Sequence, residues 1–181
     1  YSPDETPFNH CFIGYAPEFV ARAKGDAAAL IRETRSIENW GKGRTFVLPA
    51  QIKLMNDGAI FSQLMQMKDG YTDGHKGVWM MDDADFRFAF DTYWDAGYQI
   101  HIHNNGDAGM DRLLDSLEAA IKRRPRQDHR TVIVHFGFAA DAQVEMLAVE
   151  TRLLKRMDAH TPRSAGHLAT FARQGIERAP L

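Results

Sequence analysis

The chain has 181 residues, of which 44% are apolar and 25% are charged, a composition typical of a globular protein rather than a disordered, collagen-like or coiled-coil chain. The 22 Lys and Arg nearly balance the 24 Asp and Glu, and the net charge of −2 provides no basic field for nucleic acid or an anionic membrane. No apolar run approaches the roughly 20 residues of a membrane span. We therefore expect neither a nucleic-acid nor a membrane partner.

The single cysteine, Cys11, excludes an intramolecular disulfide framework and a zinc ribbon. It is compatible with a reducing compartment, and we expect a cytoplasmic protein. The chain opens with Tyr-Ser-Pro-Asp and has no signal-like apolar segment there. We therefore expect the true N-terminus to lie upstream.

The N-terminal third predicts two or three elements. Residues 1–12 contain two prolines and are predicted to form a loop or the end of an element. From Pro17 to about Trp40, apolar residues recur at roughly helical spacing and predict one or two helices. Thr45 to Leu54 is rich in β-type residues and predicts a strand, which ends at Asn56-Asp57-Gly58.

Residues 58–81 predict a long loop with three glycines after its first residue, and loops of this length tend to be lids or binding loops. Asp83 is the predicted cap of the helix that follows. A core-facing aromatic stripe recurs at i, i+4, i+7 and i+8 and is closed by Gly97. Its members are Phe86, Phe90, Tyr93 and Trp94.

The remaining pattern alternates strands with helices. Tyr98 to His103 predicts a strand, Asp107 to Arg123 an amphipathic helix, and Thr131 to Phe136 a buried strand, with another helix from about Ala140. The basic residues at 123–126 are predicted to cap the helix that they follow. No further buried strand is apparent beyond Glu150. Alternation of this kind predicts an α/β fold with parallel strands, in a doubly wound sheet or a barrel.

Functional residues of parallel α/β folds gather at the carboxyl ends of the strands. Lys53, His103 and His135 lie near three such ends, and each precedes a loop that contains glycine. A histidine at one strand end is more often a satisfied core residue than a ligand. Two histidines at successive strand ends favour a shared site.

Two of the residues near these ends allow alternatives. His101 and His103 share a face of their strand and could together bind zinc, but we prefer His101 as a residue that packs or hydrogen-bonds within the sheet. Lys53 lies in an apolar segment, where an unpaired ammonium is costly. Either its amine reaches solvent at an edge, or its chemistry is altered by desolvation or modification.

Three motifs, taken in order, resemble a known family. They are Ile-Lys-Leu-Met-Asn-Asp-Gly, His-Ile-His-Asn-Asn-Gly-Asp and Val-Ile-Val-His-Phe-Gly. Together they resemble the metal-dependent amidohydrolase superfamily, in the branch that includes N-substituted formamide deformylases. The resemblance covers about residues 45–147, and it implies part of a TIM-like (β/α) barrel.

This resemblance implies roles for the three strand-end residues. Lys53 would be carboxylated and bridge two divalent metal ions such as zinc, with His103 and His135 as further ligands. The family also uses a His-x-His motif on strand one and an Asp on strand eight as general base, and neither has a counterpart here. The resemblance therefore implies that residues 1–181 are one barrel fragment, without the remaining strands, the small β-sandwich domain or the catalytic base.

The function implied is hydrolysis of C–N bonds in small amide or formamide substrates. Asp57 and the loop at residues 58–81, with Tyr71 and Trp79, would shape the substrate pocket, and the isolated chain would lack activity. An alternative is a non-catalytic α/β fragment that self-associates, because an incomplete sheet exposes strand edges and apolar surface. On either hypothesis we expect a homo-oligomer.

Overall fold

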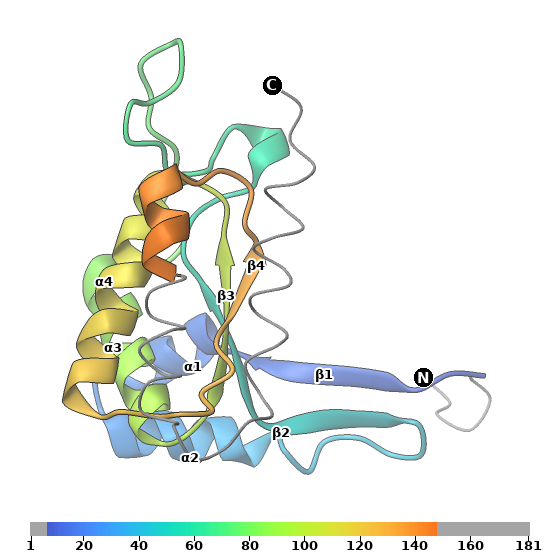
Figure 1. Ribbon diagram of the computed structural model, residues 1–181. Helices are drawn as coiled ribbons and strands as arrows, with labels where there is room; N and C mark the ends of the chain where they lie inside the picture. Colours follow the sequence, from blue (N-terminus) through green and yellow to red (C-terminus); the bar gives the residue numbers. More distant parts are fainter. Residues whose placement is uncertain (1–6, 148–181) are drawn as a thin grey trace.

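The computed structural model describes residues 7–147, whose arrangement is shown in Figure 1. In chain order its elements are β1 (His10–Tyr15), α1 (Ala16–Ala23), α2 (Ala27–Ser36), β2 (Thr45–Met55), the 3-10 helix η1 (Ile60–Ser62), α3 (Asp83–Asp95), β3 (Gln99–Asn104), α4 (Asp107–Arg123) and β4 (Val132–His135). Residues 141–147 are also helical. None of the described helices is both long and apolar enough to cross a bilayer. The prediction for the chain beyond Glu150 concerns residues outside the described part.

The strands form one four-stranded sheet in the order β1-β2-β3-β4, and each neighbouring pair is parallel. Parallel neighbours need a crossover that returns the chain to the starting end of the sheet. Helices α1 and α2 provide it after β1, α3 after β2 and α4 after β3. In Figure 1, α3 and α4 lie together on one side of the sheet. The predicted α/β fold is confirmed, and it is consistent with part of a (β/α) barrel.

The core fills the space between this side of the sheet and the helices. Side chains alternate between the two faces of a strand, and the central strands follow that rule. Ile52 and Leu54 of β2, with Ile100 and Ile102 of β3, are completely buried, whereas the residues between them are only half-buried. One face of the sheet is therefore covered by helices, and the other is more open.

Helix α3 supplies the largest part of this core. Its predicted aromatic stripe, Phe86, Phe90, Tyr93 and Trp94, is completely buried. The helix cap is Asp82 rather than the predicted Asp83, since the Asp82 carboxylate accepts a hydrogen bond from the backbone N–H of Asp85 (2.7 Å). Both aspartates suit a helix start, but only the residue just outside the helix has the extended backbone that capping needs.

The prediction of a loop or the end of an element over residues 1–12 is wrong from His10 onward, where β1 begins. Strand β1 pairs with β2 on both sides of an irregularity in register, with Cys11 opposite Phe46 and Tyr15 opposite Lys53. In Figure 1 the two strands extend away from the helices as an arm. Much of this arm lacks a covering layer, because Phe12 and Phe46 are 53% and 40% exposed. The strand is therefore defined by its partner rather than by a buried pattern of its own.

The strand predicted at residues 131–136 is present as β4, but the prediction that it is buried is wrong. Val132, Ile133 and Val134 are half-buried and His135 is exposed. Within residues 7–147, β4 is the last strand of the sheet and has only β3 beside it. An apolar sequence alone cannot distinguish such an edge strand from a central one.

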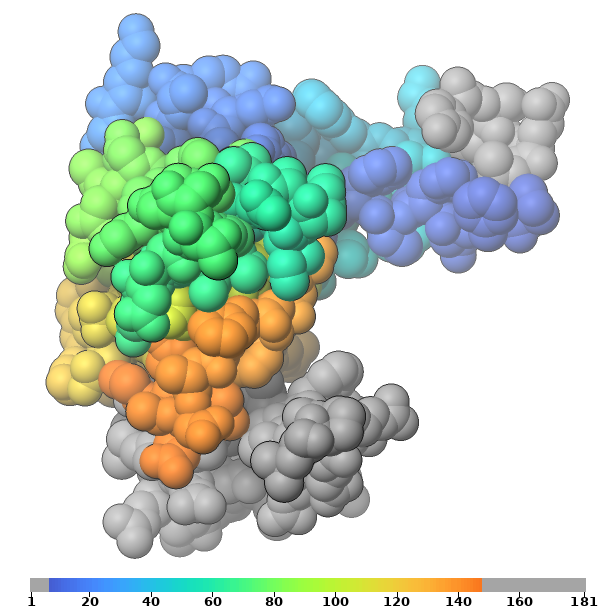
Figure 2. Space-filling view, turned by 90° about the horizontal axis from the view of Figure 1, so that it is seen from above, coloured from blue at the N-terminus to red at the C-terminus, as the bar shows by residue number. Residues whose placement is uncertain are grey.

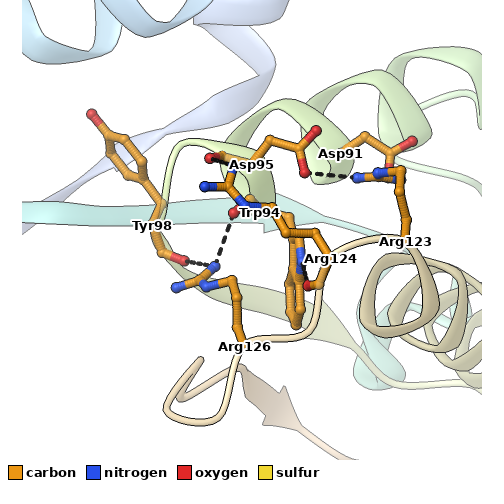
Figure 3. A network of polar contacts seen from close by, with 7 residues as sticks. All are labelled: Asp91, Trp94, Asp95, Tyr98, Arg123, Arg124 and Arg126. Atoms are coloured by element: carbon orange, nitrogen blue, oxygen red, sulfur yellow. Dashed lines mark hydrogen bonds and ion pairs between the residues drawn. The ribbon is translucent and has the colours of Figure 1, made fainter.

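The prediction that the basic residues at 123–126 cap α4 is confirmed for Arg124, the C-cap residue of α4, whose backbone N–H donates to the carbonyl oxygen of Ala120 (2.8 Å). The arginine side chains also bind the C-terminal end of α3 (Figure 3). Arg126 donates to the carbonyl oxygens of Gly97 (2.9 Å) and Tyr98 (3.0 Å), and Arg124 donates to that of Asp95. The carbonyls at a helix end lack partners within the helix, and cations there are favourable. These contacts fasten the segment after α4 to the end of α3.

The long loop at residues 58–81 lies at the carboxyl ends of the strands. Figure 2 views this end from above and shows the loop, in green, beside the orange segment that includes β4. The backbone N–H of Ala108, at the start of α4, donates to the carbonyl oxygen of Gln66 (3.1 Å). A Cβ at Gly106 would lie only 2.0 Å from that oxygen, so glycine is needed for this close approach.

Candidate metal centre

Lys53, His101 and His103 lie on the more open face of the sheet. Register pairs Lys53 with His101, and Met55 with His103. Paired residues of parallel strands point to the same side, and all of these side chains are half-buried. Since their neighbours Ile52, Leu54 and Ile102 point into the core, the polar side chains point away from it.

His103 and His135 lie in contact at the carboxyl ends of β3 and β4. Their ring centroids are 4.6 Å apart, and the rings are nearly perpendicular, at 77°. The register pairs His135 with Asn104, whose side chain is buried on the helix-covered side. His135 and the next residue, Phe136, have positive φ angles of 80° and 53°, so the regular strand conformation ends at His135. The two predicted histidines therefore come together.

Burial favours the neutral forms of His103 and Lys53. Burial lowers the pKa of His103, as do the neighbouring His135 and Lys53, while Asp57 and the Gly58 carbonyl oppose that effect. Burial also lowers the pKa of Lys53. No ion pair among residues 7–147 includes Lys53. Neutral imidazole is the form that binds a metal, so these shifts favour metal binding.

The donors fit a divalent metal ion, although the described residues supply only part of a ligand set. Imidazole nitrogen suits zinc and other transition metals, and two imidazoles meet here with a lysine amine on the same open face. Residues 7–147 contain no group of three His, Cys, Asp or Glu side chains placed to hold a metal. A complete site on these strands therefore needs Lys53 or a ligand from outside the described part.

The preferred interpretation of His101 agrees with its contacts. Its Nε2 lies 3.0 Å from the Oε1 atom of Gln51 on the neighbouring strand. Burial lowers its pKa, with a further contribution from Lys53. His101 is thus hydrogen-bonded within the sheet, one row behind His103.

Asp57, predicted to contact substrate, is completely buried behind the site. Its carboxylate accepts hydrogen bonds from the backbone N–H groups of Gln66 (2.9 Å), Asn105 (2.8 Å) and Gly106 (2.7 Å). These donors belong to the long loop and to the turn after β3. The contact with substrate stays a prediction, whereas the structure shows that Asp57 joins two loops.

The aromatic residues predicted to bind substrate lie in different surroundings within the long loop. The Tyr71 ring stacks on His75 at 4.3 Å, and its hydroxyl donates to the Met65 carbonyl (3.3 Å). Trp79 is 39% exposed, and its ring packs on the Arg112 guanidinium at 4.0 Å. Their roles in substrate binding stay predictions.

Sequence reasoning missed Arg112, which joins α4 to the end of β2. The side chain is buried between the rings of Trp79 and Phe86 and donates to the Oδ1 atom of Asn56 (2.7 Å) and the carbonyl oxygen of Met81 (3.1 Å). Burial lowers its pKa to about 10, so it remains charged at neutral pH. Its position among the apolar residues of an amphipathic helix was the available signal.

The fold and the histidine pair define an α/β protein whose candidate site lies at the carboxyl ends of parallel strands. The sequence profile of the Amidohydrolase family matches residues 15–167, and the chain belongs to this family. A comparison with curated protein sequences gives no match.

Two solved structures share the fold. They are crystal structures of an uncharacterized metal-dependent hydrolase from Pyrococcus furiosus (TM-score 0.53) and of one from Pyrococcus horikoshii OT3 (TM-score 0.52). Each is 20% identical to this chain and covers 76% of it. The chain covers 26% and 25% of those proteins, or about a quarter of their length.

Proposed function

We propose that this chain contributes the metal-binding strands of a hydrolase that cleaves C–N bonds in small amides or formamides. The observation that carries the proposal is the contact between His103 and His135 at adjacent strand ends, with Lys53 on the same open face. Membership of the Amidohydrolase family supports the same chemistry. We propose zinc as the ion, since imidazole is a ligand that it prefers, and two ions in the complete enzyme.

We propose that the Lys53 amine is modified to a carbamate, which binds the metal ions. Its neutral amine nitrogen attacks carbon dioxide, a C–N bond forms, and the nitrogen loses one proton to solvent. The product is an anion with two oxygen donors in place of a half-buried ammonium. Burial lowers the pKa of Lys53, which increases the neutral fraction that reacts and thus supports this step.

The protein's own residues hold and orient the reacting groups. A divalent ion held by His103, His135 and the Lys53 carbamate would supply Lewis-acid polarisation of the substrate carbonyl and would lower the pKa of water in the site. Tyr71 and Trp79, in the loop above the strand ends, contact the organic part of the substrate. The described site residues include no candidate for the general base, so we propose that the base lies outside them.

Zinc binding to the purified chain tests the metal assignment. We expect His103→Ala and His135→Ala each to weaken zinc binding strongly, measured by competition with a chromophoric chelator, while His101→Ala serves as the matched histidine control. Equal zinc binding by the wild type and the His103→Ala/His135→Ala double variant would reject these ligands.

We expect the chain alone to show negligible hydrolysis of formamides even with zinc. If the wild-type chain hydrolysed a formamide and His135→Ala abolished that activity, the chain alone would contain a working site.

Self-association of a non-catalytic chain is the second candidate function. Large apolar side chains are exposed on and near the arm formed by β1 and β2, including Phe8 (58%) and Trp40 (65%). A second copy could cover this surface. Sedimentation velocity tests the proposal, since a monomer at high concentration would contradict both self-association and the expected homo-oligomer.

A further inference from the structure

We propose that Asn105, held in place by Asp57, is a positioning residue that sets the orientation of the His103 ring. The inference rests on the proposed function in that it treats His103 as a metal ligand. The residues that ligate a metal must also be oriented, and partners behind a ligating histidine commonly fix its ring. Here those partners can be traced from the backbone outward.

The first step is the attachment of the turn after β3. The Asp57 carboxylate accepts from the consecutive backbone N–H groups of Asn105 (2.8 Å) and Gly106 (2.7 Å), and also from Gln66 in the long loop. A carboxylate that binds several backbone N–H groups away from solvent forms charge-assisted hydrogen bonds, which are stronger than neutral ones. The backbone of Asn105 is therefore fixed against the end of β2.

The second step is the orientation of the Asn105 amide. Its Nδ2 atom donates to the carbonyl oxygen of Gly58, at 2.9 Å. A reversed amide would turn its oxygen toward that carbonyl and place two acceptors against each other. The contact with Gly58 therefore fixes which end of the amide faces the histidine.

The third step is the contact with the ring. Asn105 Nδ2 also lies 3.0 Å from His103 Nε2, within hydrogen-bond distance. An amide N–H can only donate, so Nε2 is the acceptor and a neutral His103 ring carries its proton on Nδ1. Asn105 therefore fixes both the orientation and the tautomer of the ring.

The adjacent Asn104 offers a matched control. It is also a buried asparagine, but its amide lies on the helix-covered side, where Oδ1 accepts from Asn56 (2.6 Å) and Nδ2 donates to Gly106 O (3.2 Å). Loss of either amide removes buried hydrogen bonds and lowers stability. Only loss of Asn105 removes a partner of His103.

The experiment compares Asn105→Ala with Asn104→Ala by two measurements on the full chain. The first is zinc affinity, which we expect Asn105→Ala to raise by about 10-fold, because the Nε2 lone pair of His103 is then no longer occupied by a donor. Asn104→Ala should change it by no more than about twofold. The second is the NMR signal of the His103 ring carbons and protons in the metal-free chain, assigned with His103→Gln. We expect these signals to move in Asn105→Ala and to stay in place in Asn104→Ala.

The outcomes separate this inference from the proposed function. An unchanged His103 signal and unchanged zinc affinity in Asn105→Ala would overturn the positioning role. A wild-type chain that binds no zinc would count against the metal site, and the metal-free NMR comparison would still decide the positioning role. Should Asn105→Ala fail to fold, Asn105→Ser supplies a small polar side chain that is too short to reach Nε2, and the same two measurements apply.

Discussion

The two faces of the central strands differ in what their side chains do. On one face Ile52, Leu54, Ile100 and Ile102 are completely buried against the helices. On the other face Lys53, His101 and His103 are half-buried and polar. The same alternation of the backbone therefore divides one strand into residues that stabilise the fold and residues that are available for chemistry.

At the end of β3, two adjacent asparagines also have their partners on opposite sides of the sheet. Asn104 bonds to Asn56 on the helix-covered side, and Asn105 bonds to His103 on the site side. Both are buried, so burial alone does not reveal which of them affects the site. Partners must be compared, and variants of neighbouring residues offer the sharpest test.

The largest effect is expected from the covered face. Ile102→Ala should lower the free energy of unfolding by about 2–5 kcal/mol, because it leaves a cavity in a fully buried position. His101→Ala, the adjacent residue on the open face, should cost about 1 kcal/mol or less, since it loses one partly exposed hydrogen bond to Gln51. Urea unfolding of both variants measures the difference. Equal costs would contradict the division between the faces.

A second effect concerns a histidine that lies outside the site. His129 packs on Trp94, with ring centroids 5.1 Å apart, and its Nδ1 accepts from the backbone N–H of Thr131 (3.1 Å). Burial, aided by the positive charge of Arg126, lowers its pKa from 6.5 to about 4. The unfolded chain therefore binds this proton at a higher pH than the native chain does. The free energy of unfolding should fall by about 3 kcal/mol as the pH drops from 6.5 to 4.

His129→Asn tests the source of this pH dependence. The amide oxygen of asparagine can still accept from Thr131, but it does not titrate in this range. Unfolding free energies measured at several pH values should depend less on pH in the variant than in the wild type. An identical slope would assign the loss of stability to other groups, among them the half-buried His101 and His103, whose pKa values are also lowered by burial.

The sequence predicts those parts of the fold that have a strong local pattern. The aromatic stripe of α3 recurs at helical spacing and is buried where expected. β1 lacks such a local pattern. It is a strand because it pairs with β2, and the helices α1 and α2 separate these two strands along the chain. The apolar sequence of β4 indicates a strand but not its place at the end of the described sheet.

Part of the candidate site could also be predicted from the sequence. The proximity of His103 and His135 could be predicted because the carboxyl ends of neighbouring parallel strands adjoin. The hydrogen bonds of Asp57 could not be predicted, because its partners are backbone N–H groups from two loops, and residue types do not reveal such contacts. Such contacts depend on how the loops fold against each other.

A smaller effect on stability is expected where the long loop meets the covered face. Arg112→Met should lower the free energy of unfolding by about 2 kcal/mol, because it leaves buried acceptors on Asn56 and Met81 without a donor. The fluorescence of Trp79 should report a more exposed ring, with Trp79→Phe identifying its signal. Arg112→Lys is the control that keeps the charge but not the planar stacking. A stable Arg112→Met with unchanged fluorescence would show that Arg112 does not fasten the loop.

The smallest effect on stability is expected at Tyr71, on the open part of the long loop. Its ring stacks on an exposed histidine, and its hydroxyl makes one long hydrogen bond. Tyr71→Ala should therefore cost about 0.5 kcal/mol or less. If the loop selects substrates, the variant should still change their ranking by kcat/KM in an active enzyme that carries these residues, while zinc content stays the same. Tyr71→Phe keeps the ring and should preserve the ranking if apolar contact is what matters. An unchanged ranking in Tyr71→Ala, and also in Trp79→Ala, would leave the loop as a support for the strand ends, and specificity would then have to come from residues on the open face itself.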